Sequence, residues 1–259
     1  MGNTTSTETN EHFGWKRDGF DHRDLVHDFQ IRNSGTDIDL TENVDIEIYT
    51  QGHLGSCTSQ AIAFCYEYDE YVQKEDTPFM PSRLFIYYNE RDMEGTTGFD
   101  AGAMIRDGIK SINQVGVCSE DMWPYDISTF TDQPLDECYE AAKHHQTVQY
   151  KRVQQSLDQI TECLHNGFPV VFGFTVFESF KSDEVRETGI VPLPEDGEGI
   201  LGGHAVVLLG ISHEKQMFKV RNSWTSDWGD HGYCWFPFEY ILNQEWVSDL
   251  WTVQKVRDE

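Results

Sequence analysis

Three short segments contain side chains that together could form a nucleophilic catalytic device. Residues 51–57 read QGHLGSC, residues 202–205 read GGHA, and residues 222–229 read NSWTSDWG. A catalytic cysteine needs a base beside it and a third group that orients the base, and Cys57, His204 and Asn222 are residues of these types. The three segments therefore point to acyl transfer through a thiolate.

The composition limits the classes of protein to which the chain can belong. Its 259 residues can bury one large core or two lobes, and 38% hydrophobic residues with 13% aromatic residues are typical of a globular protein. The formal net charge is −26, so nucleic acid and anionic membrane surfaces are excluded as electrostatic partners. A well-solvated surface is the simplest explanation of that charge.

The sequence contains no stretch of 18 apolar residues, and its beginning lacks the basic and apolar regions of a secretory signal. We therefore expect an intracellular, cytoplasmic protein without a transmembrane segment. Residues 1–6 fit the pattern for myristoylation of Gly2, with a plain polar tail as the alternative. A single acyl chain binds membranes only marginally, and no polybasic cluster follows it.

The six cysteines are widely spaced and include no CxxC pair, which argues against a disulfide scaffold and a zinc ribbon. His144 and His145 lie between Cys138 and Cys163 in the sequence, but we predict no metal site there. No cofactor is expected either.

A helix is predicted to begin at Ser56, because apolar residues from Ala61 to Val72 recur at steps of three and four. Cys57 would then lie in the first turn, where free backbone N–H groups favour a thiolate. Before this helix, residues 44–49 alternate between apolar and polar side chains, as in a half-buried strand.

Further helices are predicted from residue 81 and over residues 101–112, and strands over residues 169–176, 205–211 and 217–221. Helices in the first half and strands in the second predict an α+β fold with two lobes.

These motifs resemble those of the papain family of cysteine proteases, whose signatures are QGxCGSCW and NSWGxxWGxxGY. His204 follows Cys57 by 147 residues and Asn222 follows it by 165, against a family spacing of about 130–150. The residues that match the two signatures are Gln51, Gly52, Gly55, Ser56, Cys57, Asn222, Ser223, Trp224, Trp228, Gly229, Gly232 and Tyr233.

The resemblance implies a helical lobe over about residues 51–145 and a β-rich, barrel-like lobe over about residues 146–259, with the active site in the cleft between them. It implies that Cys57 is the nucleophile, His204 the general acid and base, and Asn222 the group that orients His204. Gln51 would stabilise the oxyanion. Peptides or proteins would be the substrates.

Other positions receive weaker roles from the same resemblance. Trp224 would shield the bond between Asn222 and His204, and Trp228 is more simply explained as a packing residue. A substrate groove is expected along Gly98, Asp100, Ala101, Gly102 and Gly203.

Several departures from the family pattern indicate a divergent member. Leu54 replaces a disulfide-forming cysteine and its partner is missing as well, in agreement with a reducing compartment. Thr58, Thr225 and Asp227 replace an aromatic residue and two glycines, so the walls of the cleft are expected to differ.

Only 56 residues precede Cys57 in this sequence, so we expect no long helical propeptide of the kind that the family carries. We expect a polar and possible regulatory tail over residues 1–30 and a peptidase domain over residues 31–259. The aromatic-rich residues 13–29 suggest a hypothesis in which this stretch packs over the cleft. A catalytically silent binding module and an acyl transferase remain as alternatives to a peptidase.

Overall fold

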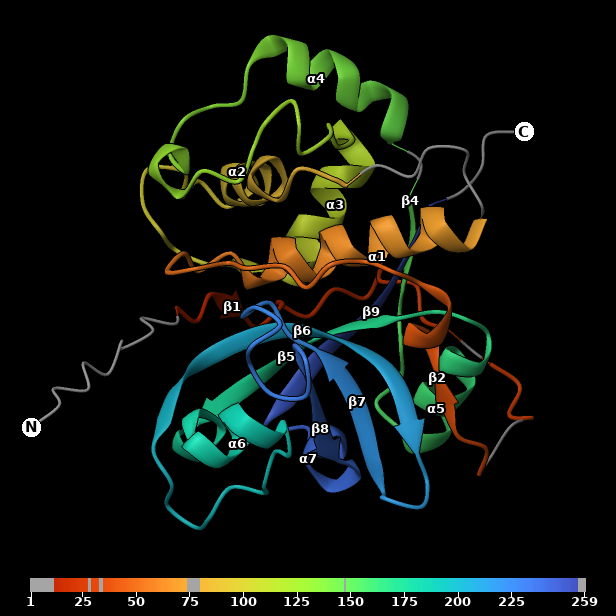
Figure 1. Ribbon diagram of the computed structural model, residues 1–259. Coiled ribbons are helices and arrows are strands. Elements are labelled where there is room, and N and C mark those ends of the chain that lie inside the picture. The colour runs from red at the N-terminus through yellow and green to blue at the C-terminus, as the bar shows by residue number, and fades with distance from the viewer. Residues whose placement is uncertain (1–11, 28, 33–34, 74–79, 147, 256–259) are drawn as a thin grey trace, which may run out of the picture.

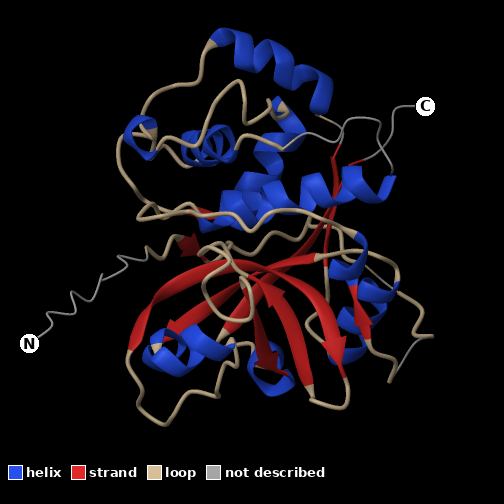
Figure 2. Ribbon diagram, viewed as in Figure 1, coloured by secondary structure: helices blue, strands red, loops and turns tan. Residues whose placement is uncertain are grey.

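The structure is a computed structural model that describes residues 12–27, 29–32, 35–73, 80–146 and 148–255. The helices of the first half form one layer and a large antiparallel sheet forms the other (Figures 1 and 2). Gly2 and the polar residues at the start of the chain lie outside the described residues.

The helical layer is built around α1, which begins at the predicted nucleophile. Ser82 starts α2 by accepting a hydrogen bond from the N–H of Phe85 at 3.1 Å, which confirms the helix predicted from residue 81. The layer contains α1 (Cys57–Gln73), α2 (Arg83–Met93), α3 (Ile105–Val115), α4 (Asp136–Ala142), and the 3-10 turns η2 (Ile127–Thr129) and η3 (Lys143–His145).

The sheet has seven strands, which pair in the order β4, β9, β5, β6, β7 and β8, with β2 pairing separately with β6. Its pairings are antiparallel throughout. The strands are β2 (Ile38–Asp39), β4 (Val148–Arg152), β5 (Val170–Phe177), β6 (Ile200–Ser212), β7 (Met217–Arg221), β8 (Tyr233–Pro237) and β9 (Val247–Lys255).

Short helices cover the outer side and edges of the sheet (Figure 1). They are α5 (Leu157–His165), α6 (Asp183–Thr188), α7 (Phe238–Leu242), and the 3-10 turns η1 (Leu40–Asn43) and η4 (Glu178–Lys181). One continuous core joins the two layers, because α1 packs directly on β6 and β9.

A second, two-stranded sheet joins the start of the chain to the helical layer. β1 (Trp15–Lys16) pairs in parallel with β3 (Ala103–Met104). Figure 1 shows β1 between α1 and the large sheet. Residues of the expected N-terminal tail therefore lie between the two layers.

One secondary-structure prediction was wrong, and another was confirmed except at its start. Residues 44–49 form no strand, and the carbonyl groups of Ile46 and Glu47 instead accept hydrogen bonds from the guanidinium of Arg221. The helix predicted over residues 101–112 begins only at Ile105, because Gly102 has a φ of +63° and Ala103 pairs with Trp15.

Candidate active site

Cys57 is the first residue of α1, so its side chain lies where unpaired helical N–H groups gather. The thiol is fully buried, and this burial raises its pKa to about 12. The backbone N–H groups of Ala205 and Gly14 act in the opposite direction and lower the pKa. The thiol therefore lies beside the residue that follows His204, and it is neutral in this arrangement.

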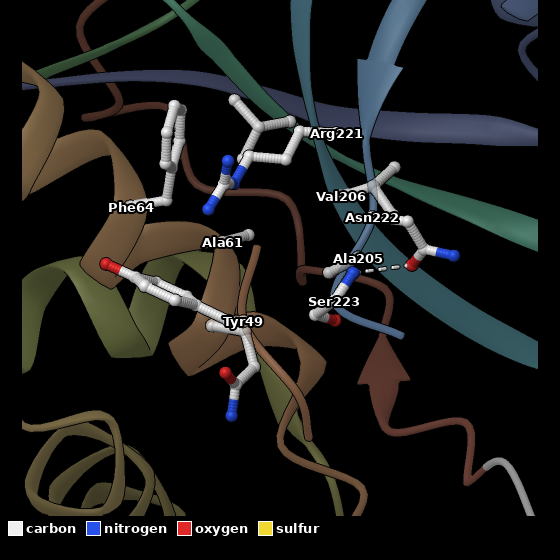
Figure 3. A pocket seen from close by; sticks show the side chains of 10 residues that line it. Tyr49, Ala61, Phe64, Ala205, Val206, Arg221, Asn222 and Ser223 are labelled. Atoms are coloured by element: carbon white, nitrogen blue, oxygen red, sulfur yellow. Dashed lines mark hydrogen bonds between the residues drawn. The ribbon is translucent and has the colours of Figure 1, made fainter. Parts of the chain in front are cut away.

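His204 lies in β6 and Asn222 directly follows β7, so pairing of the two strands brings these side chains together. Nε2 of His204 lies 2.8 Å from Oδ1 of Asn222. The same oxygen accepts a hydrogen bond from the N–H of Ser223 at 2.8 Å (Figure 3). These two contacts fix the carboxamide, and the carboxamide in turn fixes the imidazole ring.

The second ring nitrogen of His204, Nδ1, has no hydrogen-bond partner among the described residues, although it is buried. Burial lowers the pKa of His204 to about 4, despite the opposing effect of the bond to Asn222. This nitrogen lies on a ring whose neighbour in the chain, Ala205, directs its backbone N–H at the Cys57 thiol.

Aromatic rings enclose the imidazole. Trp224 stacks on His204 with ring centroids 4.8 Å apart and an interplanar angle of 26°. Trp228 meets Trp224 edge to face at 5.3 Å, one ring further from His204. Phe180 packs against both tryptophans, and Phe174 contacts the imidazole from the sheet. The rings exclude water from the bond between His204 and Asn222.

Gln51 is completely buried, and its side chain is held from both ends. Its Oε1 accepts a hydrogen bond from the hydroxyl of Ser223 at 2.7 Å, and its Nε2 donates to the carbonyl of Leu54 at 3.0 Å. The same Nε2 also donates to the carbonyl oxygen of His12 at 3.0 Å. A carbonyl oxygen of the chain itself therefore accepts the hydrogen bond that the side chain of Gln51 donates.

Residues 12–18, called the covering segment below, extend across these side chains. The ring of Phe13 lies 6.2 Å from His204 and 6.1 Å from Trp224, centroid to centroid. The carbonyl of Gly14 accepts a hydrogen bond from the N–H of Ala103 at 2.8 Å. The segment thereby buries the side chains that the three sequence motifs supply.

Gly14 is the point of closest approach in the covering segment. A Cβ atom at this position would lie only 1.8 Å from the carbonyl oxygen of Gly55. On the other side, a Cβ atom on Gly102 would lie 2.0 Å from the carbonyl oxygen of Gly14. Only glycine fits at residue 14 without moving backbone atoms.

A charged cluster anchors the end of the covering segment. Asp18 lies 3.2 Å from Arg152 and accepts a hydrogen bond from the N–H of Arg106. Asp24 continues the cluster by contacting Arg152 at 2.7 Å and Arg106 at 3.5 Å. Burial, together with repulsion from Asp249, raises the pKa of Asp18 to about 6.

The predicted groove residues divide into two groups. Gly102 and Gly203 face the covering segment, and Asp100 accepts hydrogen bonds from the N–H of Gly55 at 3.0 and 3.1 Å. Gly98 belongs to the second group, because a Cβ atom there would meet no atom within 4 Å. Ala101 also makes no specific contact with the covering segment that the structure records; it precedes Gly102 in the sequence.

The sequence suggested that residues 13–29 pack over the cleft, but it did not single out Trp15 or Asp18 or link them to Asp249. Asp249 lies more than 200 positions from both, and only folding brings the three together. It also missed Phe180, which the aromatic-rich composition did not distinguish from ordinary core residues.

The other cysteines, and two of the residues that depart from the family pattern, Leu54 and Thr58, pack inside the protein. All six cysteines are free and buried. Leu54 packs with Leu84 and Tyr87, and the hydroxyl of Thr58 donates to the buried carboxyl group of Glu90 at 2.6 Å. Among the described residues, no group of three potential metal ligands is found. No helix in this part of the chain is both long and apolar enough to cross a bilayer.

Comparisons with known proteins agree with this architecture. A sequence profile of the papain family cysteine proteases matches residues 35–241. An uncharacterised peptidase C1-like protein of Acanthamoeba polyphaga mimivirus is 46% identical over 216 residues, which are 80% of this chain and 70% of that protein.

Two solved structures extend the comparison to three dimensions. The crystal structure of xylellain, a cysteine protease from Xylella fastidiosa, superposes with a TM-score of 0.88 at 37% identity and covers 96% of this chain and 98% of its own. A procathepsin B from Trypanosoma congolense shares the fold with a TM-score of 0.72 at 17% identity, covering 98% and 90% of the two chains. With its two layers, its motifs and these relatives, the chain belongs to the papain family of cysteine proteases.

Proposed function

We propose that the chain hydrolyses peptide bonds through Cys57, His204, Asn222 and Gln51. The observation that carries this proposal is the position of His204. Its Nε2 lies 2.8 Å from Asn222, its ring is stacked on Trp224, and the neighbouring Ala205 N–H faces the thiol of Cys57.

In the proposed reaction, the proton of the Cys57 thiol passes to His204 and the sulfur attacks the carbonyl carbon of the substrate. The developing oxyanion takes the place of the His12 carbonyl and accepts the hydrogen bond from Nε2 of Gln51. His204 then gives its proton to the leaving amine, which leaves an acyl group on sulfur. Water, deprotonated by His204, attacks this thioester and releases the acid and the free thiol.

We further propose that the covering segment keeps the peptidase latent. Its His12 carbonyl accepts the hydrogen bond that Nε2 of Gln51 would otherwise donate to the oxyanion, and its Phe13 ring covers His204. It also contributes to the burial that opposes the thiolate–imidazolium pair, since that burial raises the pKa of Cys57 to about 12 and lowers that of His204 to about 4. When the segment moves away, water reaches both side chains and the ion pair becomes accessible.

A pair of cysteine variants tests the catalytic proposal. Cys57→Ser should abolish hydrolysis of a fluorogenic peptide, whereas Cys65→Ser, a substitution of a buried cysteine in the same helix, should retain it. Both are compared in a Gly14→Val background, in which the covering segment is expected to be displaced. Activity that survives Cys57→Ser, or that disappears equally in both variants while they remain folded, would refute the assignment of Cys57.

A further inference from the structure

The side chain of Trp15 fills a pocket in the large sheet. Two neighbouring strands provide its wall through glycines, Gly173 in β5 and Gly203 in β6. A Cβ atom on Gly173 would lie 1.9 Å from the indole ring, and one on Gly203 would lie 2.7 Å from it. The ring therefore packs directly against backbone, and the pocket is as wide as the sheet allows.

A buried carboxylate provides a polar partner in the same pocket. Nε1 of Trp15 donates a hydrogen bond to Oδ2 of Asp249 at 3.2 Å, and Asp249 is only 5% exposed. Asp249 lies where the pairing of β9 with β5 shifts register, and its φ is +58°. Such an irregularity turns a side chain out of the regular alternation, and here it coincides with the carboxylate that receives the indole N–H.

The charge of Asp249 is balanced by a residue of the same sheet. Nη1 of Arg152 lies 3.4 Å from Oδ1 of Asp249. Arg152 also contacts Asp18 and Asp24, but these two acids belong to the N-terminal stretch that would leave the groove. The free pocket would then contain one carboxylate paired with one guanidinium, with Oδ2 of Asp249 available as an acceptor. A neutral donor suits this pocket better than a second cation.

The glycines, Asp249 and Arg152 all belong to the large sheet, whereas Trp15 and the two acids belong to the N-terminal stretch. We propose that this pocket selects peptide substrates with a tryptophan side chain: Gly173 and Gly203 admit the bicyclic ring, and Asp249 accepts the hydrogen bond of its N–H. This inference rests on the proposed function, because it treats Trp15 as the occupant of a substrate position.

Substrate profiling on the full-length Gly14→Val protein tests the pocket. A library of fluorogenic peptides varies each of the four residues before the scissile bond in turn among tryptophan, benzothienylalanine, phenylalanine, leucine, alanine and arginine. Benzothienylalanine has the shape of tryptophan with sulfur in place of the N–H. At one position, kcat/KM for tryptophan should exceed that for benzothienylalanine by about tenfold, as for a hydrogen bond to a charged group. Equal values at every position, or a preference for arginine over tryptophan, would overturn the inference.

Two pocket variants locate this preference. Asp249→Gly suits the positive φ and removes the acceptor, so the two bicyclic substrates should become equal within about twofold while leucine substrates are still cleaved. Gly173→Val fills the pocket and should lower kcat/KM for tryptophan by about tenfold or more, with alanine substrates retained. A tryptophan preference that survives both substitutions would refute the role of this pocket.

Failure of the catalytic proposal gives a different result. If no peptide is hydrolysed, the proposed function is wrong, and the affinities of the tryptophan and benzothienylalanine peptides are then measured by calorimetry on the same Gly14→Val protein. Tighter binding of the tryptophan peptide, lost in Asp249→Gly, would still support the pocket. Equal affinities would refute it.

Discussion

Replacing Gly14 by valine should displace the covering segment and raise the peptidase activity of the full-length protein. A Cβ atom at this position would lie 1.8 Å from the carbonyl oxygen of Gly55, which belongs to the backbone that leads into α1. Because no flexible side chain is available to give way, the segment itself must move by more than about 1 Å to restore an ordinary contact.

The size of the effect follows from the contacts that such a movement breaks. The carbonyl of His12 would lose its bond to Gln51, and the carbonyl of Gly14 its bond to Ala103, each worth about 1 kcal/mol. Overpacking adds at least about 1 kcal/mol. A total of about 3 kcal/mol increases the population with an open groove, and hence the initial rate, by about a hundredfold.

The assay compares initial rates of the full-length wild type, Gly14→Val and Gly19→Val on one fluorogenic peptide. Gly19 is the matched control, because a Cβ atom there meets nothing nearer than Arg106 at 3.8 Å. Intact mass before and after the assay establishes that the chain has not been cleaved. Equal rates for wild type and folded Gly14→Val, or equal activation by Gly19→Val, would refute the reasoning.

Three further predictions concern protons and orientation. Asp18 has a pKa of about 6 when the covering segment is in place, so it binds a proton when the segment closes over the groove. His204 has a pKa of about 4 when covered, so it binds a proton when the segment opens. Because these two effects oppose each other, wild-type activity relative to that of Gly14→Val should vary little between pH 4 and 6. Asp18→Asn removes the first effect, so this ratio should rise toward acid pH, and a flat profile would contradict the linkage. Burial raises the pKa of Glu90 well above its usual value, so the folded wild type loses stability as pH rises and the carboxyl group is forced to ionise, whereas Glu90→Gln does not. The melting temperature of Glu90→Gln should therefore increase relative to that of wild type between pH 5 and 9. A constant difference between the two melting temperatures over this range would contradict a neutral carboxyl group. Asn222→Ala should lower kcat in the Gly14→Val background by on the order of a hundredfold, and an unchanged kcat would exclude an orienting role.

The sequence predicted the parts of the fold whose patterns are local. Residues 217–221 form a strand as predicted, and Cys57 begins a helix because the apolar residues after it recur at helical spacing. The alternation of apolar and polar residues over 44–49 predicted a strand that does not form. The side chain of Arg221, at the end of β7, donates hydrogen bonds to backbone carbonyl groups that a neighbouring strand would otherwise pair with.

The site was predictable only where motifs mark it. Gln51, His204 and Asn222 stand in recognisable segments, whereas Asp249 is an ordinary residue of a C-terminal strand until folding places it beside Trp15. The close fit of Gly14 against Gly55 likewise depends on a crossing of two backbones far apart in the sequence. Such contacts leave no local pattern, so the aromatic-rich residues 13–29 suggested a covered cleft, but the individual contacts became visible only in three dimensions.

Trapping of the acyl group on full-length Gly14→Val tests the central claim most directly. The protein is mixed with an activated ester substrate, quenched in acid during turnover, digested and analysed by mass spectrometry. The account predicts an acyl group on Cys57, distinguished by fragmentation from Cys65 in the same helix and absent after His204→Ala. Product formation without an acyl group on Cys57, or an acyl group on a different cysteine, would contradict it.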